Sequence, residues 1–443
     1  MVDVRIAAGR DRSLKVLFTA TDRLEGSIHS QPSKSYTIRY LVASLLSEGV
    51  TVIENPSICD DTLAVVKACE AFGAKVESGR DLIRISSTGY LEIPNAIIDC
   101  GGSATAIRIL SAVASLAPGI TVLTGDESLR SRPIGPLIDA LRRLGVEAYS
   151  TRMNGLPPVI VFGGGIPGGC TWIDGSISSQ YVSGLLFVLP KARKKSSLKV
   201  IGEIESKGYI DLTLSVLERF RVKVERSGYS YFEAEVGQDY RSPATCRVPG
   251  DYSSSSFILV ACSILPSKVR IYDLVESDIQ PDRLIVDIVR DLGVNVRFGS
   301  GYLEIESCGD TLNGFEVDVR DSPDLAPPLA ALACFCKGVS RIKGCRRLRF
   351  KESDRLKAIS SELTRIGVKV EVNEDAISIH GSGRVDGGYT YSWGDHRIAM
   401  MLAVLGLGSR RGVVVDGFDC VSKSYPKFLS DLEAIGGRFS FVG

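Results

Sequence analysis

The sequence has little net charge, no paired cysteine motif and no long hydrophobic run. Its 443 residues carry a formal charge of +1, whereas dedicated nucleic-acid-binding proteins are usually strongly basic. Its eleven cysteines include no Cys-x-x-Cys spacing, which argues against a zinc site and favours reduced thiols in a cytoplasmic protein. The longest apolar runs, near Phe257–Leu265 and Ile398–Leu407, are too short to cross a bilayer, and residues 1–15 lack the apolar core of a signal peptide.

The chain is otherwise of ordinary composition. Apolar residues make up 44% and charged residues 24%, as is typical of globular proteins. A chain of this length exceeds one ordinary hydrophobic core, so two domains are expected. Because the bulk charge is nearly zero, any anion-binding site must come from local clusters of basic residues.

Six short polar clusters each run directly into an apolar helix rich in Ala and Leu. Ser, Thr and Asp suit a helix N-terminus, because their side-chain oxygens accept hydrogen bonds from its free N–H groups. Helices that are apolar on all sides are buried, so these six should be core helices whose N-termini open at a surface or cleft. Helix N-termini attract anions, and several of these carry Lys, Arg or His, which indicates a cleft for a polyanionic substrate. The six starts are Pro32-Ser33-Lys34-Ser35, Gly102-Ser103-Ala104-Thr105, Ser178-Ser179-Gln180, Asp251-Tyr252-Ser253-Ser254, Ser322-Pro323-Asp324 and Gly394-Asp395-His396-Arg397.

A second set of helices is amphipathic, and each is followed by a short alternating strand. Glycine, which suits the left-handed position that ends a helix, stands at five of the six helix-to-strand junctions, and Arg221 stands at the other. The units repeat about every 70 to 75 residues, which indicates an internal repeat. The five glycines are Gly73, Gly145, Gly293, Gly367 and Gly436.

Six units of strand and helix predict an α/β (α+β) protein with three units in each of two similar lobes. The count and the doubled helices exclude a (β/α)8 barrel. Strands in the first unit are expected at Val50–Glu54, Lys75–Ser78 and Leu82–Ser86. The segment 246–251 falls between the third and fourth units, and the stretch before Lys34 is assigned to the second lobe. The expected lobes are therefore 34–249, and 1–33 together with 250–443.

Basic side chains at these helix starts and in nearby loops are candidate ligands for phosphate and carboxylate groups, although any one of them alone could be a solvated surface charge. They are Lys34, Arg39, Arg108, Arg132, Arg355, Arg397 and Lys423.

Three further residues could transfer protons in such a cationic cleft. Glu352 lies near a helix start between Lys351 and Arg355, Asp324 follows a proline at another, and His396 lies beside Asp395. Neighbouring charges would tune the pKa values of these groups for acid–base work. The alternative for the carboxylates is simple helix capping, because Asp and Glu are favoured in first turns.

Several motifs occur together in one order along the chain. They resemble the 5-enolpyruvylshikimate-3-phosphate (EPSP) synthase family from about residue 25 to the end. The resemblance implies a two-domain inside-out α/β barrel of six repeated units. The motifs are Lys34-Ser35-x-x-x-Arg39, Gly101-Gly102-Ser103-Ala104-Thr105-Ala106-x-Arg108, Arg132-Pro133-Ile134-Gly135, Asp174-Gly175-Ser176-x-Ser178-Ser179-Gln180, Ser322-Pro323-Asp324, Lys351-Glu352-Ser353-Asp354-Arg355-Leu356 and Asp395-His396-Arg397.

The resemblance implies transfer of the enolpyruvyl group of phosphoenolpyruvate to the 5-hydroxyl of shikimate 3-phosphate, with release of phosphate. It implies a monomer that needs no metal or organic cofactor. It makes Asp324 the proton acceptor for the hydroxyl and Glu352 the group that moves the proton at C3, with Lys34 as a helper. The implied ligands of shikimate 3-phosphate are Lys34, Ser35, Arg39, Ser178, Ser179, Gln180, Ser206, Tyr209, Asp324 and Lys351. Those of phosphoenolpyruvate are Lys34, Ala104, Arg132, Gln180, Arg355, Arg397 and Lys423, and Arg108 and His396 should lie near the site.

The chain departs from the family pattern at two informative positions. Where the family often has Asn-Ala-Gly-Thr, this chain has Gly102-Ser103-Ala104-Thr105, so a methyl group replaces hydrogen beside phosphoenolpyruvate and tolerance of the longer inhibitor glyphosate is expected. Arg347 stands where the family often has Asn, so that substrate contact does not carry over.

Three alternative functions stay open at this point, one of which is a non-catalytic relative that binds phosphometabolites; the intact acid, base and cation sets argue against it. UDP-N-acetylglucosamine enolpyruvyl transferase shares the fold and chemistry, but it typically has Lys-Asn in place of Lys34-Ser35 and a reactive Cys in the loop that corresponds to 125–132. RNA 3′-phosphate cyclase uses related repeats, and a salt-dependent affinity for RNA would favour it.

Overall fold

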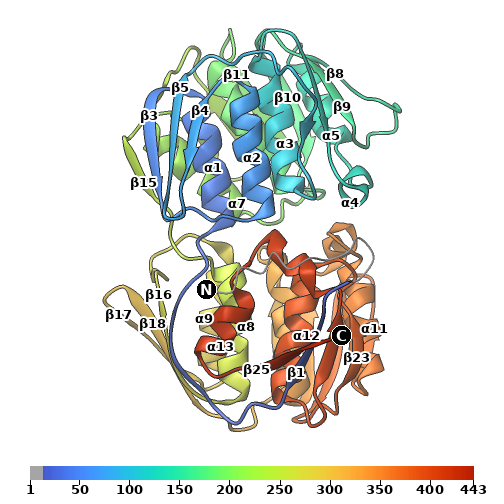
Figure 1. Ribbon diagram of the computed structural model, residues 1–443. Helices are drawn as coiled ribbons and strands as arrows, with labels where there is room; N and C mark the ends of the chain where they lie inside the picture. Colours follow the sequence, from blue (N-terminus) through green and yellow to red (C-terminus); the bar gives the residue numbers. More distant parts are fainter. Residues whose placement is uncertain (1–12) are drawn as a thin grey trace.

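The computed structural model describes residues 13–443 and shows two lobes, one above the other (Figure 1). Residues 1–12 lie outside the described residues, and with them most of the segment 1–15 that lacks the apolar core of a signal peptide. Buried apolar side chains form two clusters. One runs from Tyr36 to Val248, and the other joins residues 16–28 to residues 252–435.

Each lobe has three buried helices in its interior, as the sequence predicts. Four of their N-termini are capped by a side chain, from Ser103, Ser178, Asp251 and Asp395. The predicted cap at Ser33 is wrong, because its hydroxyl is buried without a hydrogen-bond partner in the described chain. The buried helices are α1 (Lys34–Leu45), α3 (Ala104–Val113), α6 (Ser179–Val188), α8 (Tyr252–Ile264), α10 (Ala326–Phe335) and α12 (His396–Gly408).

The cap predicted from Ser322 is also wrong. Pro323 follows it and has no N–H to donate, and the Ser322 hydroxyl instead donates to the carbonyl of Pro281 at 2.8 Å. The chain then makes a short 3-10 turn, Pro323–Leu325, before α10 begins, and Asp324 lies on that turn.

A second, amphipathic helix follows in every unit, and the predicted helix ends are confirmed. The five junction glycines have φ between 85° and 96°. Arg221 takes the equivalent left-handed conformation, with φ 63°, in the unit that lacks a glycine there. These helices are α2 (Asp60–Ala71), α5 (Gly135–Arg143), α7 (Gly208–Arg219), α9 (Leu284–Asp291), α11 (Arg355–Arg365) and α13 (Phe428–Ala434); a further short helix, α4 (Glu127–Arg130), lies between α3 and α5.

Six sheets within residues 13–443 share one topology, in which an edge strand runs parallel to its neighbour and two antiparallel strands follow. The first-lobe sheets are β3 (Ser47–Glu54), β4 (Lys75–Ser78), β5 (Leu82–Thr88), β14 (Tyr240–Arg241) and β15 (Thr245–Arg247); β6 (Ile98–Asp99), β7 (Ile120–Thr124), β8 (Glu147–Ser150) and β9 (Val159–Phe162); and β10 (Cys170–Asp174), β11 (Ser196–Ile201), β12 (Glu225–Ser227) and β13 (Tyr231–Ala234). The second-lobe sheets are β2 (Leu24–His29), β16 (Pro266–Tyr272), β17 (Asn295–Gly299) and β18 (Tyr302–Cys308); β19 (Glu316–Asp318), β20 (Lys337–Lys343), β21 (Lys369–Val372) and β22 (Ala376–Ser382); and β1 (Lys15–Thr19), β23 (Gly388–Tyr391), β24 (Val413–Asp416) and β25 (Arg438–Val442).

Two strands cross between the lobes. β2 leads into α1 of the first lobe but pairs in parallel with β16 of the second, with Gly26 opposite Val269. Conversely, β15 leads into α8 of the second lobe but pairs in parallel with β3 of the first, with Cys246 opposite Ile53. The two connections meet where Pro32 bridges to Gly250. The lobes are therefore joined by two adjacent chain segments, which leaves a cleft on one side of the joint.

No helix in the described part of the chain is both long enough and apolar enough to span a membrane.

Candidate active site

A cleft lies between the lobes, and all six buried helices direct their N-terminal ends towards it. Its lining includes the first residues of α1, α3 and α6 from one lobe, and of α8 and α12 from the other; the turn before α10 contributes Asp324. Free N–H groups and positive helix dipole ends therefore surround one space, which favours an anionic ligand. This convergence is the arrangement that the six polar clusters predict.

Lys34 begins α1 and forms an ion pair with Asp61, with 2.8 Å between Nζ and Oδ2. Asp61 lies in the first turn of α2, the neighbouring helix of the same lobe. Burial alone would lower the pKa of Lys34, but the carboxylate of Asp61 outweighs it and the net pKa is raised. Lys34 is therefore a firmly protonated cation in the cleft.

Arg39 lies one turn further along α1 and is only 1% exposed. Its guanidinium donates to Thr213 Oγ1 at 2.8 Å, to the Ser35 carbonyl at 3.0 Å and to the Tyr209 carbonyl at 3.1 Å, all neutral oxygens. Burial lowers the pKa of Arg39 to about 10. A buried cation held by neutral groups is well placed to pair with a ligand carboxylate or phosphate.

Arg108 links two other helix starts of the first lobe. Its Nη1 donates to Gln180 Oε1 at 2.8 Å and to Ser178 Oγ at 3.1 Å, and its guanidinium lies over the Tyr181 ring. Gln180 in turn donates to Thr105 Oγ1 at 2.8 Å. These bonds fix the rotamers of the side chains that face the cleft.

Arg355 is the centre of the second-lobe half of the site. Its side chain is 1% exposed and contacts three carboxylates: Asp324 at 2.7 Å, Glu352 at 2.7 Å and Asp395 at 2.8 Å. Because each carboxylate comes from a different loop or helix start, one guanidinium holds them all in place.

Asp324 also contacts two further cations, Arg397 at 3.1 Å and Lys351 at 3.4 Å. Burial opposes ionisation of Asp324, but Arg397, Lys351 and Arg355 together hold its pKa well below the ordinary value. Burial likewise opposes ionisation of Glu352, and Arg355 and Arg132 hold its pKa well below the ordinary value. Both candidate acid–base groups are thus ionised carboxylates in a cationic cleft.

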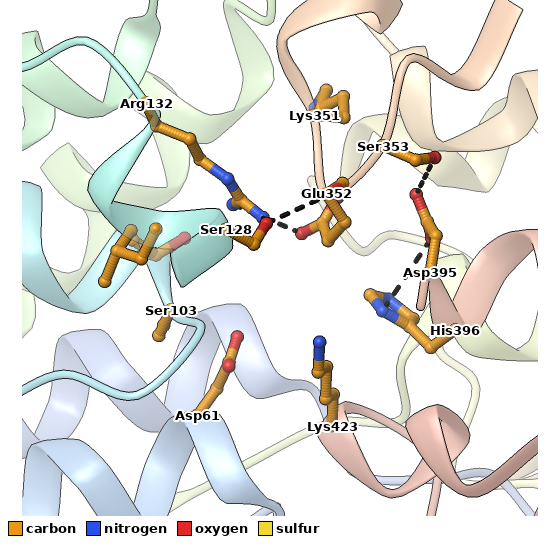
Figure 2. A network of polar contacts seen from close by, with 12 residues as sticks. Asp61, Ser103, Ser128, Arg132, Lys351, Glu352, Ser353, Asp395, His396 and Lys423 are labelled. Carbon is orange, nitrogen blue, oxygen red and sulfur yellow. Dashed lines mark hydrogen bonds and ion pairs between the residues drawn. The ribbon is translucent and has the colours of Figure 1, made fainter. Parts of the chain in front are cut away.

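Contacts across the cleft join Glu352 to the first lobe (Figure 2). Its Oε1 lies 3.5 Å from Arg132 Nη1, and its backbone carbonyl accepts a hydrogen bond from Ser128 Oγ at 3.1 Å. Ser128 lies in α4, and Arg132 lies in the loop that follows it. The two lobes therefore meet at the carboxylate assigned to proton transfer at C3.

The EPSP synthase family, described as EPSP synthase (3-phosphoshikimate 1-carboxyvinyltransferase), matches residues 18–432 of the chain. The chain belongs to the EPSP synthase family.

Curated relatives and solved structures agree with this family. The chain is 42% identical to the 3-phosphoshikimate 1-carboxyvinyltransferase of Methanothermobacter thermautotrophicus, over 94% of this chain and 97% of that protein. It is also 42% identical to the enzyme of that name from Aeropyrum pernix, over 95% of each chain. The structure of EPSP synthase from Acinetobacter baumannii superposes with a TM-score of 0.82 at 25% identity, covering 97% of this chain and all of that one. The two-lobed α/β architecture expected from the sequence is thus that of an EPSP synthase.

The cleft of this family member is lined by nearly every site residue that the sequence predicts, Arg108 and His396 included. Lys423 is the exception, because it lies at the rim, where its Nζ donates to the Gly394 carbonyl at 3.2 Å. Its side chain approaches Gly102 of the other lobe, beside the start of α3. Lys423 is therefore close to the cleft without lining it.

His396 lies in the cleft without a hydrogen-bond partner on either ring nitrogen in the described chain. Burial and then the neighbouring Arg397 lower the pKa of His396 to about 3. The imidazole is therefore neutral at physiological pH and leaves one donor and one acceptor free to meet a ligand.

Three carboxylates near the cleft escaped the sequence reasoning. Asp61 pairs with Lys34, Glu205 pairs with Arg347 at 3.3 Å, and Asp282 accepts a hydrogen bond from Tyr209 at 2.9 Å. Burial and the nearby charge of Asp324 raise the pKa of Asp282 to about 6. The two adjacent acids at the start of α2 were a signal for Asp61, and Asp282 follows Pro281 at the helix start before α9, a signal like that of Pro323 and Asp324. Glu205 had no such signal.

Residues 13–443 hold no cluster of three His, Cys, Asp or Glu side chains that could bind a metal ion. No cysteine of that range lines the cleft, and burial raises the pKa of the nearby Cys59 thiol.

Proposed function

We infer that this cleft carries out the reaction of the family to which the chain belongs. The enzyme transfers the enolpyruvyl group of phosphoenolpyruvate to the 5-hydroxyl of shikimate 3-phosphate and releases phosphate, a step of the shikimate pathway to aromatic amino acids. The carrying observation is the convergence of six helix N-termini and several buried cations on two ionised carboxylates, Asp324 and Glu352. The substrates bring two phosphates and two carboxylates, which is the charge that such a cleft complements.

The reaction requires two proton transfers, one at C3 of phosphoenolpyruvate and one from the 5-hydroxyl. Protonation of C3 makes C2 of phosphoenolpyruvate electrophilic, the 5-hydroxyl adds to C2, and the tetrahedral intermediate then eliminates phosphate. In our proposal Asp324 accepts the proton of the hydroxyl, Glu352 moves the proton at C3, and Lys34 assists as a general acid or by charge. Lys34 and Glu352 come from opposite lobes, so substrate between the lobes lies between them.

Substrate binding should itself raise the proton affinity of both carboxylates. Without substrate, Arg397, Lys351 and Arg355 hold the pKa of Asp324 low, and Arg355 and Arg132 hold that of Glu352 low. Phosphate and carboxylate groups of the substrates would neutralise these cations and move the pKa values towards the range needed for proton transfer. The acid–base pair would then become active only when both ligands are bound.

We assign the two ligand sets as the resemblance to the family implies. Shikimate 3-phosphate lies against the first lobe, with its 5-hydroxyl towards Asp324 and with Lys351 beside it; this set is Lys34, Ser35, Arg39, Ser178, Ser179, Gln180, Ser206 and Tyr209 with those two. Phosphoenolpyruvate lies near the lobe junction, where most of its ligands are cations. This set is Lys34, Ala104, Arg132, Gln180, Arg355 and Arg397, with Lys423 at the rim. Arg provides planar, bidentate recognition of such groups, and Lys acts as a point charge.

The alternative enolpyruvyl transferase is disfavoured by the same site. Its reactive cysteine has no counterpart in the loop 125–132, where the structure places Ser128 and Arg132 against Glu352. An RNA-binding function is disfavoured by the near-neutral charge.

We also propose the organisation of the protein around this activity. The lobes divide at residues 33/34 and 249/250, with residues 1–33 belonging to the second lobe. The two apolar clusters support this division, and so do β1 and β2, which pair with β24 and β16 of the second lobe. The enzyme acts as a monomer. It acts in the cytoplasm, a compartment that its eleven unpaired thiols favour.

The deciding experiment is phosphate release from phosphoenolpyruvate in a metal-free, chelator-containing buffer. Release with shikimate 3-phosphate and not with UDP-N-acetylglucosamine is the expected result. Release only with the sugar nucleotide would assign the enzyme to the alternative reaction, and dependence on added metal would contradict the absence of a cofactor.

A further inference from the structure

A buried carboxylate of the second lobe holds the turn that leads into α12. Glu362 lies on α11, which packs beside β23 (Figure 1), and its side chain is fully buried. Its Oε1 accepts a hydrogen bond from the indole N–H of Trp393 at 2.8 Å, and its Oε2 accepts one from the backbone N–H of Tyr391 at 3.0 Å. Glu362 and Trp393 both lie outside the lining of the cleft, so any effect of this pair on a ligand must pass through the turn.

The burial of Glu362 needs compensation, because a carboxylate removed from water is costly unless it is paired and hydrogen-bonded. Its cationic partner is Arg365, with Nε 3.3 Å from Oε2, but the side chain of Arg365 is 48% exposed and water screens its charge. The two N–H donors of the segment 391–393 therefore provide much of the compensation. A charge-assisted hydrogen bond of this kind is stronger than a neutral one, so the segment is held firmly against α11.

The turn has an unusual backbone. Trp393 and Gly394 are both in the left-handed region, with φ of 58° and 63°. Glycine adopts this conformation freely, whereas a bulky side chain such as that of tryptophan adopts it rarely and at a cost. Residues held in such conformations persist only where the surrounding structure fixes them, and they cluster at functional sites. The hydrogen bond from Trp393 to Glu362 is a contact that fixes this one.

The turn reaches the phosphoenolpyruvate side of the cleft at two points. The carbonyl of Gly394 accepts a hydrogen bond from Lys423 Nζ at 3.2 Å, and Lys423 ends the short 3-10 helix Phe418–Lys423. Asp395, the next residue of the chain, caps α12 and contacts Arg355 at 2.8 Å. Lys423 and Arg355 are both assigned above to phosphoenolpyruvate. A shift of the turn would therefore disturb the ligands of that substrate first.

We propose that Glu362 is a positioning residue for phosphoenolpyruvate, which holds Trp393 and thereby fixes the Gly394 carbonyl that orients Lys423. The proposal rests on the proposed function and adds to it a residue outside the lining of the cleft. Loss of the bond between Glu362 and Trp393 releases the strained turn, the Gly394 carbonyl turns away, and Lys423 loses its orientation. Shikimate 3-phosphate is affected little, because in the described chain the hydrogen bonds of residues 391–394 involve none of its assigned ligands.

Two substitutions break the bond from opposite ends. Trp393→Phe keeps an aromatic ring but lacks the indole N–H, and Glu362→Gln keeps the shape of the side chain but lacks its charge. The matched control is Trp172→Phe, because Trp172 is the other tryptophan of the chain and lies half-exposed on β10 of the first lobe. If Glu362 acts through Trp393, the two substitutions should be non-additive, and the double variant should be little worse than the more affected single variant.

The test measures the KM of phosphoenolpyruvate by phosphate release and the dissociation constant of shikimate 3-phosphate by calorimetry. We expect Glu362→Gln and Trp393→Phe each to raise the KM of phosphoenolpyruvate by about fivefold or more, as for the loss of one hydrogen bond, with a smaller change in kcat. The dissociation constant of shikimate 3-phosphate should stay nearly unchanged in both variants. Trp172→Phe should match the wild type in both measurements.

Three results would overturn the proposal. An equal weakening of both substrates would show that the pair only supports the fold, and additive effects of the two substitutions would show that Glu362 does not act through Trp393. An unchanged KM of phosphoenolpyruvate in both single variants would show that the turn does not orient Lys423. Thermal unfolding checks that each variant is folded, and Trp393→Phe tests the proposal alone if Glu362→Gln does not fold. Failure of the wild type to release phosphate with shikimate 3-phosphate would refute the proposed function instead, so the two failures are distinguishable.

Discussion

Glu352 of the second lobe and Arg132 of the first lie 3.5 Å apart across the cleft. Their side chains are 19% and 6% exposed, so the contact exists in a largely dry site. Separation of the lobes would break it, expose Glu352 to water and weaken the electrostatic interactions on which proton transfer depends. Arg132 of the first lobe is thus part of the surroundings of Glu352, the carboxylate to which we assign the proton at C3.

Glu352→Gln should remove the proton-transfer group with little change in shape. We expect kcat to fall by about 10²–10⁴-fold, the usual contribution of general acid–base catalysis, with a smaller change in KM. Incorporation of solvent deuterium at C3 of phosphoenolpyruvate should fall in parallel with phosphate release. Continued deuterium exchange at the wild-type rate would move the C3 proton to another group, with Lys34 the next candidate.

Asp324→Asn should show whether Asp324 acts as the catalytic base or only positions the substrate. Asp324 contacts Arg355, Arg397 and Lys351, so the neutral amide leaves three cations with less compensation. We expect a loss of kcat of about 10²-fold or more from the missing base. Anionic ligands should bind no more weakly than to the wild type, because the cleft becomes more positive. A variant that keeps its kcat but loses affinity would show that Asp324 only positions the substrate.

The buried imidazole of His396 should make the enzyme sensitive to acid. The pKa of His396 is about 3 in the folded state, set first by burial and then by Arg397, with Asp395, Glu352 and Lys34 as its other charged neighbours. An unfolded histidine titrates near about 6.5, so between these pH values only the unfolded chain binds the proton. Protonation of His396 in the unfolded chain therefore lowers the free energy of unfolding as the pH falls from about 6.5 towards 3.

The comparison that isolates this term is wild type against His396→Gln. Between pH 7 and pH 4 the wild type should lose stability relative to the variant, by at most about 1.4 kcal/mol per pH unit. Thermal or denaturant unfolding at several pH values measures the difference, in which other titrating groups largely cancel. A difference that does not vary with pH would show that folding leaves the pKa of His396 unchanged.

Ala104 should govern the response to glyphosate. It begins α3 and lines the cleft, so its methyl group stands where a glycine would leave space. We expect inhibition by glyphosate to be weak, and Ala104→Gly to lower its inhibition constant by about tenfold or more with a smaller effect on the KM of phosphoenolpyruvate, as for relief of a close contact. Inhibition constants measured against phosphoenolpyruvate test this, and a low-micromolar value for the wild type would contradict it.

Local signals in the sequence predicted much of this fold. The polar clusters marked the starts of the six buried helices, and the junction glycines marked the ends of the amphipathic ones, because both depend on a few adjacent residues. The stretch that holds β2 was assigned to the second lobe, but the strands with which β2 and β15 pair were less accessible. Their strand pairing depends on partners more than 190 residues away, such as Val52 for Thr245.

Motif order likewise located most of the cleft, but it did not reveal how the charges are compensated. Arg355 was recognised as a cation, yet its three carboxylate partners come together only in the folded chain. Glu205 had no local pattern at all, because its partner Arg347 lies in the other lobe. Ion pairs between distant segments are the part of a site that single-sequence patterns do not encode.

The position of β1 has a consequence for how the enzyme is made. Val16 pairs with Val415 on one side and with Phe441 on the other, so both neighbours of β1 are synthesised long after it. Until they emerge from the ribosome, the apolar side chains of Val16 and Phe18 have no sheet to join. The first lobe can assemble before β24 and β25 are made, whereas the second must wait for them. A nascent chain that stops short of Val413 would release an incomplete second lobe with its N-terminal strand exposed to aggregation.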